Sequence, residues 1–161
     1  MAKEKETKTN VMRVLDRAKI PYRTYTYEHG DGPVDGESVA ALLGQNPEQV
    51  FKTLVTRGER GGFFVFVIPV GRELDLKAAA RAVGEKAVSM LHVADLLPTT
   101  GYVRGGCSPI GMKKPFPTVL DSSALNFDTI IFSAGKIGSQ VEISPHSLLD
   151  LIHAASAPLT Q

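Results

Sequence analysis

The glycine-rich segment at residues 100–114 is the part of the sequence whose composition most suggests a binding site. It holds four glycines together with Arg104, Lys113 and Lys114, and it lies between apolar segments. Glycine accepts positive φ angles and lets a ligand approach closely, and successive free N–H groups in such a turn form a concave site for an anion. The same composition is typical of a tight loop that only connects elements of a mixed fold. Composition alone leaves both interpretations open.

A second chemical signal is Lys52, which lies in the short apolar segment Phe51-Lys52-Thr53-Leu54-Val55. If this segment is a strand, alternation places Lys52 on the same face as Val50 and Leu54, and Thr53 on the opposite face. A partly desolvated ammonium group requires an anionic or carbonyl partner, such as a phosphate or an ester oxygen. The alternative is a lysine whose stem packs on the strand while its charged end reaches water.

Nucleophiles and metal ligands have little support in the sequence. Cys107, between Gly106 and Ser108, lacks a neighbouring His/Asp signature and is better explained as a small packing residue. The histidines occur singly, and no cysteine or histidine pair has the spacing of a metal site. These histidines are His29, His92, His146 and His153. The glycine pattern also differs from the Walker and dinucleotide-binding motifs, so the sequence predicts neither a metal nor a cofactor.

The bulk properties restrict the possible partners and the compartment. With 18 basic and 17 acidic side chains in 161 residues, the net charge is near zero, so any RNA contact must be local, such as a pocket for one end of a strand. A single cysteine excludes an internal disulfide and favours a reducing, cytoplasmic setting. The polar, lysine-rich start does not resemble a signal peptide or a membrane anchor, and no membrane association is expected.

Hydrophobic periodicity, capping residues and turn residues predict the order of the helices and strands. Helices are expected at residues 10–18, 35–43, 76–83 and 92–97, and from Ser144-Pro145 onward; strands are expected at 22–27, 50–57, 63–70, 87–90, 118–121, 129–133 and 140–143. Pro98 is expected to end the fourth helix, and the chain after Ala154 is expected to fray.

The grouping of these elements predicts the fold class. Strands outnumber helices and mostly follow one another, which indicates an α+β domain with a curled, mixed and largely antiparallel sheet flanked by helices. The nearly continuous apolar run at residues 63–68 predicts a central strand covered on both faces. A doubly wound nucleotide-binding fold is disfavoured. At 161 residues, we expect one domain, residues 1–161.

Several motifs, taken in order, resemble the YbaK/EbsC family, the free-standing relatives of the bacterial prolyl-tRNA synthetase editing domain. They are Phe51-Lys52-Thr53-Leu54, Glu73-Leu74-Asp75-Leu76-Lys77 with Ala79-Ala80, Thr100-Gly101-Tyr102 with Gly105-Gly106, Ser108-Pro109 and Gly111, Lys113-Lys114, and Ser133-Ala134-Gly135-Lys136 with Val141-Glu142. The similarity extends from about residue 11 to residue 153 and is strongest to the branch that deacylates Cys-tRNA(Pro).

The resemblance implies a pocket for the 3′ aminoacyl-adenosine of a mischarged tRNA. By this match, Lys52 is the central functional residue and Gly105 contributes backbone. The implied substrate-binding positions are Tyr27, Thr53, Tyr102, Gly106 and Ser133. The sequence departs from many relatives at Asp35, where an aromatic residue is common, and at Gln140, where some relatives carry aspartate. These departures concern pocket shape and amino-acid preference.

The chemistry of the family requires no protein nucleophile, since the thiol of the substrate is thought to attack its own ester carbonyl. The resemblance therefore implies a trans-editing deacylase for Cys-tRNA(Pro), with Cys-tRNA(Cys) as a further substrate and prolyl-tRNA synthetase as an expected partner. Backbone N–H groups at Gly105 and Gly106 are expected to face the oxyanion. The alternatives are a deacylase for Ala-tRNA(Pro) or another small aminoacyl-tRNA that uses a positioned water, and a non-catalytic module that binds aminoacyl-tRNA or a synthetase.

Overall fold

The computed structural model describes residues 8–30 and 32–161. Most of the lysine-rich start, residues 1–7, lies outside these ranges. The elements are α1 (Asn10–Arg17), β1 (Arg23–Thr26), α2 (Gly36–Leu43), β2 (Phe51–Gly58), β3 (Phe63–Pro69), α3 (Leu76–Val83), β4 (Val88–Met90), α4 (Val93–Thr100), β5 (Thr118–Asp121), the 3₁₀ helix η1 (Ser122–Asn126), β6 (Ile130–Ser133), β7 (Ser139–Ile143), α5 (Pro145–Ile152) and β8 (Ala155–Ala157). Among the described residues, no helix has both the length and the apolar character needed to cross a membrane.

Helices α2 and α3 begin and end at the capping residues that the sequence indicates. Asp35 accepts a hydrogen bond from the backbone N–H of Ser38 at 2.8 Å, and Asp75 caps α3 in the same way. Such side chains satisfy N–H groups that have no partner within the helix. Gly44 and Gly84 end α2 and α3 in the left-handed conformation, which glycine adopts without strain. The predicted caps of these helices are therefore confirmed.

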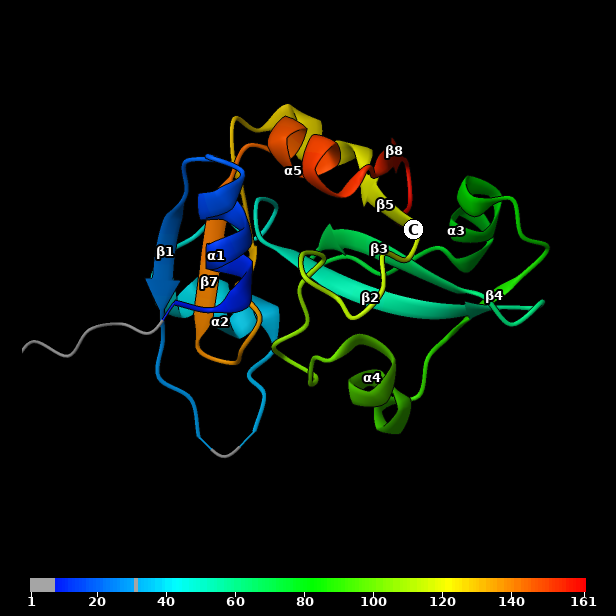
Figure 1. The fold of residues 1–161 in the computed structure, drawn as a ribbon, viewed down its shortest axis with the longest axis horizontal. Helices are drawn as coiled ribbons and strands as arrows, with labels where there is room; N and C mark the ends of the chain where they lie inside the picture. The colour runs from blue at the N-terminus through cyan, green and yellow to red at the C-terminus, as the bar shows by residue number, and fades with distance from the viewer. Residues whose placement is uncertain (1–7, 31) are drawn as a thin grey trace, which may run out of the picture.

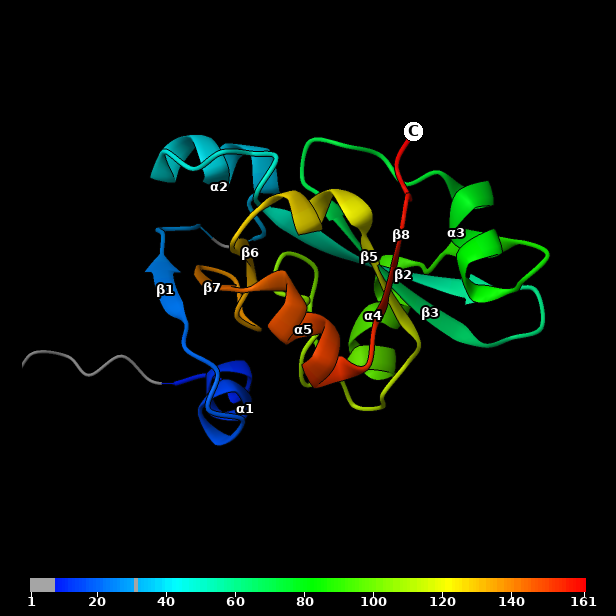
Figure 2. The same ribbon diagram turned by 90° about the horizontal axis from the view of Figure 1, so that it is seen from above.

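The strands form two sheets that meet at one point. A three-stranded antiparallel sheet has the order β1-β7-β6, and a five-stranded mixed sheet has the order β4-β2-β3-β5-β8. An isolated parallel bridge between Val50 and Ile131 connects them, and the Ile131 N–H donates to the Gln49 carbonyl at 3.0 Å. Helices flank both sheets (Figures 1 and 2). The predicted α+β fold with a mixed, largely antiparallel arrangement is confirmed, with the sheet divided into two parts.

Strand β3 is the centre of the larger sheet, as its apolar run predicts. Residues 65–68 are fully buried, and β3 pairs with β2 on one side and β5 on the other. On one face, Phe66 packs in a cluster that includes Ala79 of α3. On the opposite face, Val65 packs in a cluster that includes Leu96 of α4. Helices α3 and α4 thus cover opposite faces of the β2–β3 hairpin (Figure 1).

Helix α4 continues through Pro98 to Thr100, so the prediction that Pro98 ends it is wrong. Three carbonyl groups near the end of α4 accept hydrogen bonds from a side-chain hydroxyl, a backbone N–H and a lysine. Thr100 Oγ1 donates to the Leu96 carbonyl at 2.8 Å, the Gly101 N–H donates to the Leu97 carbonyl at 2.8 Å, and Lys113 Nζ donates to the Pro98 carbonyl at 3.3 Å. These bonds stabilise a turn that the proline ring would otherwise disfavour.

The chain after Ala154 does not fray, so the prediction of a frayed C-terminal segment is wrong. Strand β8 pairs in parallel with β5 and completes the edge of the larger sheet. Beyond it, Leu159 is fully buried, and its N–H donates to Asp121 Oδ1 at 2.8 Å. The Gln161 N–H donates to the Glu73 carbonyl at 3.1 Å. Strand pairing, the buried Leu159 side chain and the backbone hydrogen bonds therefore hold this segment in place, although its Ala/Ser-rich composition is typical of a loose tail.

We expect the replacement Leu159→Ala to lower the free energy of unfolding by about 2–5 kcal/mol, the usual range for truncation of a buried leucine. Urea denaturation followed by circular dichroism measures this change. Leu42→Ala is the matched control, since Leu42 is 64% exposed, and its effect should stay within about 0.5 kcal/mol. Equal, small effects of the two replacements would contradict the docked position of the C-terminal segment.

Candidate functional site

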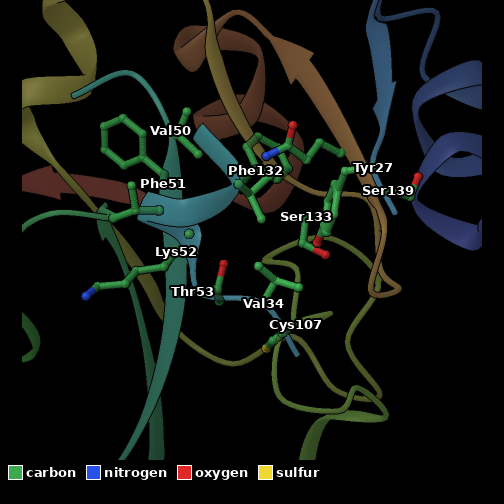
Figure 3. Close-up of a pocket in the computed structure, with 15 residues that line it drawn as sticks. Tyr27, Val34, Val50, Phe51, Lys52, Thr53, Cys107, Phe132, Ser133 and Ser139 are labelled. Atoms are coloured by element: carbon green, nitrogen blue, oxygen red, sulfur yellow. The ribbon is translucent and has the colours of Figure 1, made fainter. Parts of the chain in front are cut away.

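A small cavity lies where the two sheets meet (Figure 3). We call it the inner cavity, and its volume is about 120 Å³. Its lining residues are Tyr27, Val34, Gly36, Val39, Val50, Phe51, Lys52, Thr53, Val70, Gly105, Cys107, Phe132, Ser133, Ser139 and Gln140. The larger sheet, the smaller sheet, helix α2 and the glycine-rich segment all contribute to its walls. This volume is well above the roughly 10–15 Å³ that a single water needs, so the cavity admits a small chemical group.

A larger outer groove of about 800 Å³ adjoins the inner cavity. The two share Lys52, Thr53, Gly105 and Cys107 among their lining residues. The groove extends over residues 33–37 on one side and reaches the end of β4 and the start of α4 on the other. Its apolar lining residues include Leu54, Val55, Met90, Leu91, Val93 and Leu96. A ligand with a small group at one end and a larger planar group at the other would fit this arrangement.

Lys52 lies at the junction of the two spaces and projects from β2. The register places it opposite Ile68, next to the pair formed by Leu54 and Phe66, which confirms the predicted aliphatic surroundings. Its side chain is half-buried, and neither of the two salt bridges in the described residues includes it. Figure 3 shows the side chain extending to the other side of β2 from Tyr27 and Ser133. The ammonium group is thus available to an anion in the groove.

Thr53 brings a polar group to the opposite face of the same strand, toward the inner cavity (Figure 3). Its Oγ1 atom is buried and has no hydrogen-bond partner among the described residues. Ser133, which also lines the cavity, accepts a hydrogen bond on Oγ from the Gly135 N–H at 3.0 Å. A buried hydroxyl group without a partner is unfavourable, and a ligand in the cavity would supply the missing hydrogen bond.

Gly105 and Gly106 are both required for close packing of the glycine-rich segment. Gly105 has φ +87°, and a Cβ atom there would lie 2.6 Å from Cβ of Pro33. A Cβ atom on Gly106 would lie 3.0 Å from the backbone nitrogen of Ile137. Gly105 lines both the cavity and the groove, whereas Gly106 lines neither. The Gly106 N–H donates to the Val103 carbonyl at 3.0 Å, so the expectation that it faces an oxyanion is corrected.

Tyr102 stabilises the glycine-rich segment from the inside and does not line either space. Its hydroxyl group donates to the Ile110 carbonyl, and its ring contacts the position where Gly135 would carry a Cβ atom. Burial raises the pKa of Tyr102 to about 12, and the nearby Cys107 contributes in the same direction. The structure therefore brings together Tyr27, Lys52, Thr53, Gly105 and Ser133 from the predicted set, and places Tyr102 and Gly106 behind the wall.

Cys107 lines both spaces, yet its thiol is poorly suited to nucleophilic attack. The residue is 9% exposed and packs with Val55 and Val65. Burial raises its pKa to about 12, so the thiolate is scarce at neutral pH. Among residues 8–30 and 32–161, no group of three acidic, cysteine or histidine side chains is placed to hold a metal ion. The polar groups of the site are therefore suited to binding and positioning.

The two positions at which the sequence departs from many relatives, Asp35 and Gln140, both line the site. Asp35 caps α2 and lines the outer groove, and hydrogen bonds from the backbone and the side chain of Ser38 lower its pKa. Gln140 is 5% exposed, lines the inner cavity, and accepts a hydrogen bond on Oε1 from Gln45 Nε2 at 2.8 Å. Sequence reasoning missed Gln45, and no local signal indicates it, because its partner lies 95 positions away.

The fold and the site define an aminoacyl-tRNA editing domain. The model of the family described as "Aminoacyl-tRNA editing domain" matches residues 34–151, and the chain belongs to this family. The chain is 50% identical over 161 residues to an Enterococcus faecalis (strain ATCC 700802 / V583) protein named "Putative Cys-tRNA(Pro)/Cys-tRNA(Cys) deacylase EbsC". This match covers 99% of the chain and 98% of the relative. The identification with the YbaK/EbsC family made from sequence motifs is confirmed.

Solved structures show the same fold. A structure titled "Crystal structure of a putative trans-editing enzyme for prolyl tRNA synthetase" matches with a TM-score of 0.79 and 25% identity, over 94% of each chain. The crystal structure of the hypothetical protein APE2540 matches with a TM-score of 0.85 and 23% identity, over 95% of this chain and 100% of that chain. Bacillus subtilis (strain 168) YwhH is 30% identical over 112 residues, which cover 70% of this chain and 71% of YwhH.

We expect Cys107 to react at least about 50-fold more slowly than free cysteine with a thiol reagent at pH 7.5. A pKa near 12 reduces the thiolate fraction by about three orders of magnitude, and the greater nucleophilicity of a basic thiolate recovers only part of this loss. Stopped-flow measurement with an aromatic disulfide reagent checks the rate. Protein unfolded in urea is the control and should react like free cysteine. Equal rates for folded and unfolded protein would contradict the buried, protonated thiol.

Proposed function

We propose that this protein is a trans-editing deacylase that removes cysteine from mischarged Cys-tRNA(Pro), and also from Cys-tRNA(Cys). The observation that carries the proposal is the 50% identity, over nearly the full chain, to the relative named for these two substrates. The whole chain, residues 1–161, acts as one editing domain in the cytoplasm, where tRNA is aminoacylated. The small inner cavity and the adjoining larger groove support this assignment.

The two spaces match the two ends of an aminoacyl-adenosine. The inner cavity, at about 120 Å³, holds the small aminoacyl group, and the outer groove, at about 800 Å³, holds the terminal adenosine. The apolar side chains of the groove provide a surface for the base. Lys52 lines both spaces and binds the terminal ribose or phosphate, because a free ammonium group attracts an anionic or oxygen-rich group.

The reaction uses the thiol of the substrate as the nucleophile. The sulfur attacks the ester carbonyl carbon, a C–S bond forms, the C–O ester bond breaks, and the leaving ribose oxygen takes the thiol proton. The products are a cyclic thioester and free tRNA. Holding the thiol and the ester in attack geometry removes an entropic barrier, which contributes up to about 7–11 kcal/mol in favourable cases. This mechanism agrees with the buried, protonated state of Cys107.

The protein groups position the substrate and stabilise charge. The Gly105 backbone faces the junction and donates its N–H toward the developing oxyanion, whereas the Gly106 N–H is already engaged. Thr53 uses its unpartnered hydroxyl group, and Tyr27 and Ser133 complete the wall around the aminoacyl group. No protein nucleophile is required for this reaction.

A physical need for such an enzyme follows from the limits of substrate discrimination. A hydrophobic synthetase pocket cannot strongly exclude a wrong amino acid of similar size, so a second site removes the error. The chain carries a net charge of +1 and so lacks a strong overall attraction for tRNA. We propose that it works together with prolyl-tRNA synthetase, which supplies tRNA selectivity. Retention of full tRNA selectivity without any synthetase would contradict this partnership.

The small volume of the inner cavity also favours one alternative, removal of alanine by a water positioned by the 3′-terminal hydroxyl group. A non-catalytic module that binds aminoacyl-tRNA is the alternative from another class. Incubation of the purified protein with labelled Cys-tRNA(Pro), Cys-tRNA(Cys) and Ala-tRNA(Pro) separates these functions. Loss of label from the cysteinyl species alone supports the proposal. Loss from the alanyl species favours the water mechanism, and protection without loss favours the binding module.

We expect Lys52→Ala to reduce deacylation of Cys-tRNA(Pro) at least about 30-fold, since losing one partner of a hydrogen-bonded charge pair with the terminal ribose or phosphate costs about 2–5 kcal/mol. The free energy of unfolding should change little, because the ammonium group has no ion-pair partner among the described residues. Lys86→Ala removes an exposed lysine outside both spaces and should retain wild-type turnover. Near wild-type turnover by the Lys52 variant would refute its assigned role.

A substrate with a methylated thiol tests the chemical step. We expect S-methylcysteinyl-tRNA(Pro) to resist cleavage, because the thioether lacks the proton and the anionic character needed for attack. Single-turnover assays with saturating protein measure the rate. A gel-shift assay serves as the control that the methylated substrate still binds. Rapid cleavage of the bound, methylated substrate would exclude attack by the substrate thiol.

A further inference from the structure

Gln140 presents a hydrogen-bond donor to the inner cavity. Its Oε1 atom is occupied by the hydrogen bond from Gln45 Nε2 at 2.8 Å. Its Nε2 atom has no hydrogen bond to any described residue and is not fully buried, so this donor is free, and Gln140 lines the inner cavity. The hydrogen bond from Gln45 therefore fixes the oxygen of the Gln140 amide and leaves its N–H groups to bind a ligand in the cavity.

The other polar groups of the inner cavity are hydroxyl groups. Thr53 Oγ1 is buried without a partner, and Ser133, Ser139 and Tyr27 also line the cavity. A hydroxyl group both accepts and donates, so this set, together with Gln140, forms several hydrogen bonds with an uncharged polar ligand. It offers no full negative charge.

The charged and titratable groups around the cavity do not supply a negative charge either. Among the described lining residues, Lys52 is cationic, Cys107 keeps its proton because burial raises its pKa to about 12, and no carboxylate is present. The carboxylates of Asp35 and Glu37 line the outer groove instead. On the face of β7 that bears Gln140, the Glu142 carboxylate accepts hydrogen bonds from the hydroxyl groups of Tyr25 and Thr129, and neither it nor Tyr25 lines the inner cavity.

We infer that the inner cavity binds the aminoacyl group with its α-amino group uncharged, and that Gln140 donates a hydrogen bond to the amine nitrogen. The inference rests on the proposed function. An ammonium group would lose its water in a confined site and meet a second donor, not an acceptor, at Gln140. An uncharged amine accepts from Gln140 and donates to hydroxyl groups such as that of Thr53. Free α-amino groups have pKa values of about 8, so the uncharged form is accessible near neutral pH.

The test measures binding of a hydrolysis-resistant ligand as a function of pH. The ligand is 3′-amino-3′-deoxyadenosine acylated with 2-aminobutyric acid, in which a methyl group replaces the thiol and removes its titration. Its matched control carries 2-hydroxybutyric acid, which has no amine. Isothermal titration calorimetry from pH 5.5 to pH 9 gives the Kd values. We expect the affinity for the amino ligand to rise about tenfold per pH unit below the pKa of its amine and then level off.

The hydroxy ligand has no amine, so any change of its Kd with pH reports titration of the protein alone. We expect the Kd of the hydroxy ligand to be nearly constant with pH. An affinity for the amino ligand that is constant, or that falls as pH rises, would overturn the inference, since the site would then accept the ammonium form. Failure of both ligands to bind at any pH would overturn the inference together with the proposed function. Lack of Cys-tRNA deacylation alongside the expected pH dependence would reject only the proposed function.

The variant Gln140→Glu tests the assigned residue. A carboxylate beside the amine should pair with the ammonium form, so we expect the affinity at pH 6 to rise at least tenfold over wild type and the increase with pH to disappear. Leu42→Glu is the matched control, because it adds the same charge at a position that is 64% exposed and lines neither space. An unchanged pH dependence in a folded Gln140→Glu variant would overturn the assignment of Gln140. If thermal unfolding shows that this variant is not folded, the comparison of the two ligands on wild-type protein decides the inference.

Discussion

The position of β2 between two sheets is the constraint on which the site depends. At its start β2 meets β6 through the single bridge between Val50 and Ile131, and from Thr56 onward it pairs with β4. Along its whole length it also pairs with β3. Two backbone hydrogen bonds show how β2 is oriented: the Ile131 N–H donates to the Gln49 carbonyl, and the Leu91 N–H donates to the Val55 carbonyl. The backbone groups of odd-numbered residues in and just before β2 therefore point to the edge opposite β3. The backbone N–H and carbonyl groups of Thr53 therefore point to the part of this edge between β6 and β4, where no strand of residues 8–30 and 32–161 lies.

The inner cavity and the outer groove occupy this interruption, and the two faces of β2 supply different chemistry to them. Lys52 provides charge from one face, and Thr53 provides an unpartnered hydroxyl group from the other (Figure 3). The glycine-rich segment closes the opposite side because Gly105 tolerates contact with Pro33. This division agrees with a reaction in which the substrate carries its own nucleophile. The protein needs to supply only orientation, one cation and hydrogen bonds.

Local signals in the sequence were sufficient for the helix caps, the hairpin and the central strand, because each depends on residues that are close in the chain. Asp35 caps its helix through a residue three positions away, and alternation alone placed Lys52 among aliphatic side chains. Features that depend on distant partners could not be predicted. The last turn of α4 needs Lys113, the C-terminal segment needs Asp121, and Gln140 needs Gln45. The hydrogen bond from the Gly106 N–H to the Val103 carbonyl likewise could not be predicted, because it depends on how the backbone of this segment turns.

The single bridge between the sheets also has a consequence for the evolution of specificity. The contact at Val50 and Ile131 joins the smaller sheet to the larger one beside the site, and the residues around this contact are buried aliphatic side chains such as Ala40 and Val70. Packed side chains transmit small changes of volume to their neighbours. A conservative exchange behind the bridge can therefore alter the width of a cavity of about 120 Å³ without changing any polar group that contacts the ligand. Such a fold can acquire a new amino-acid preference while its reactive geometry is preserved.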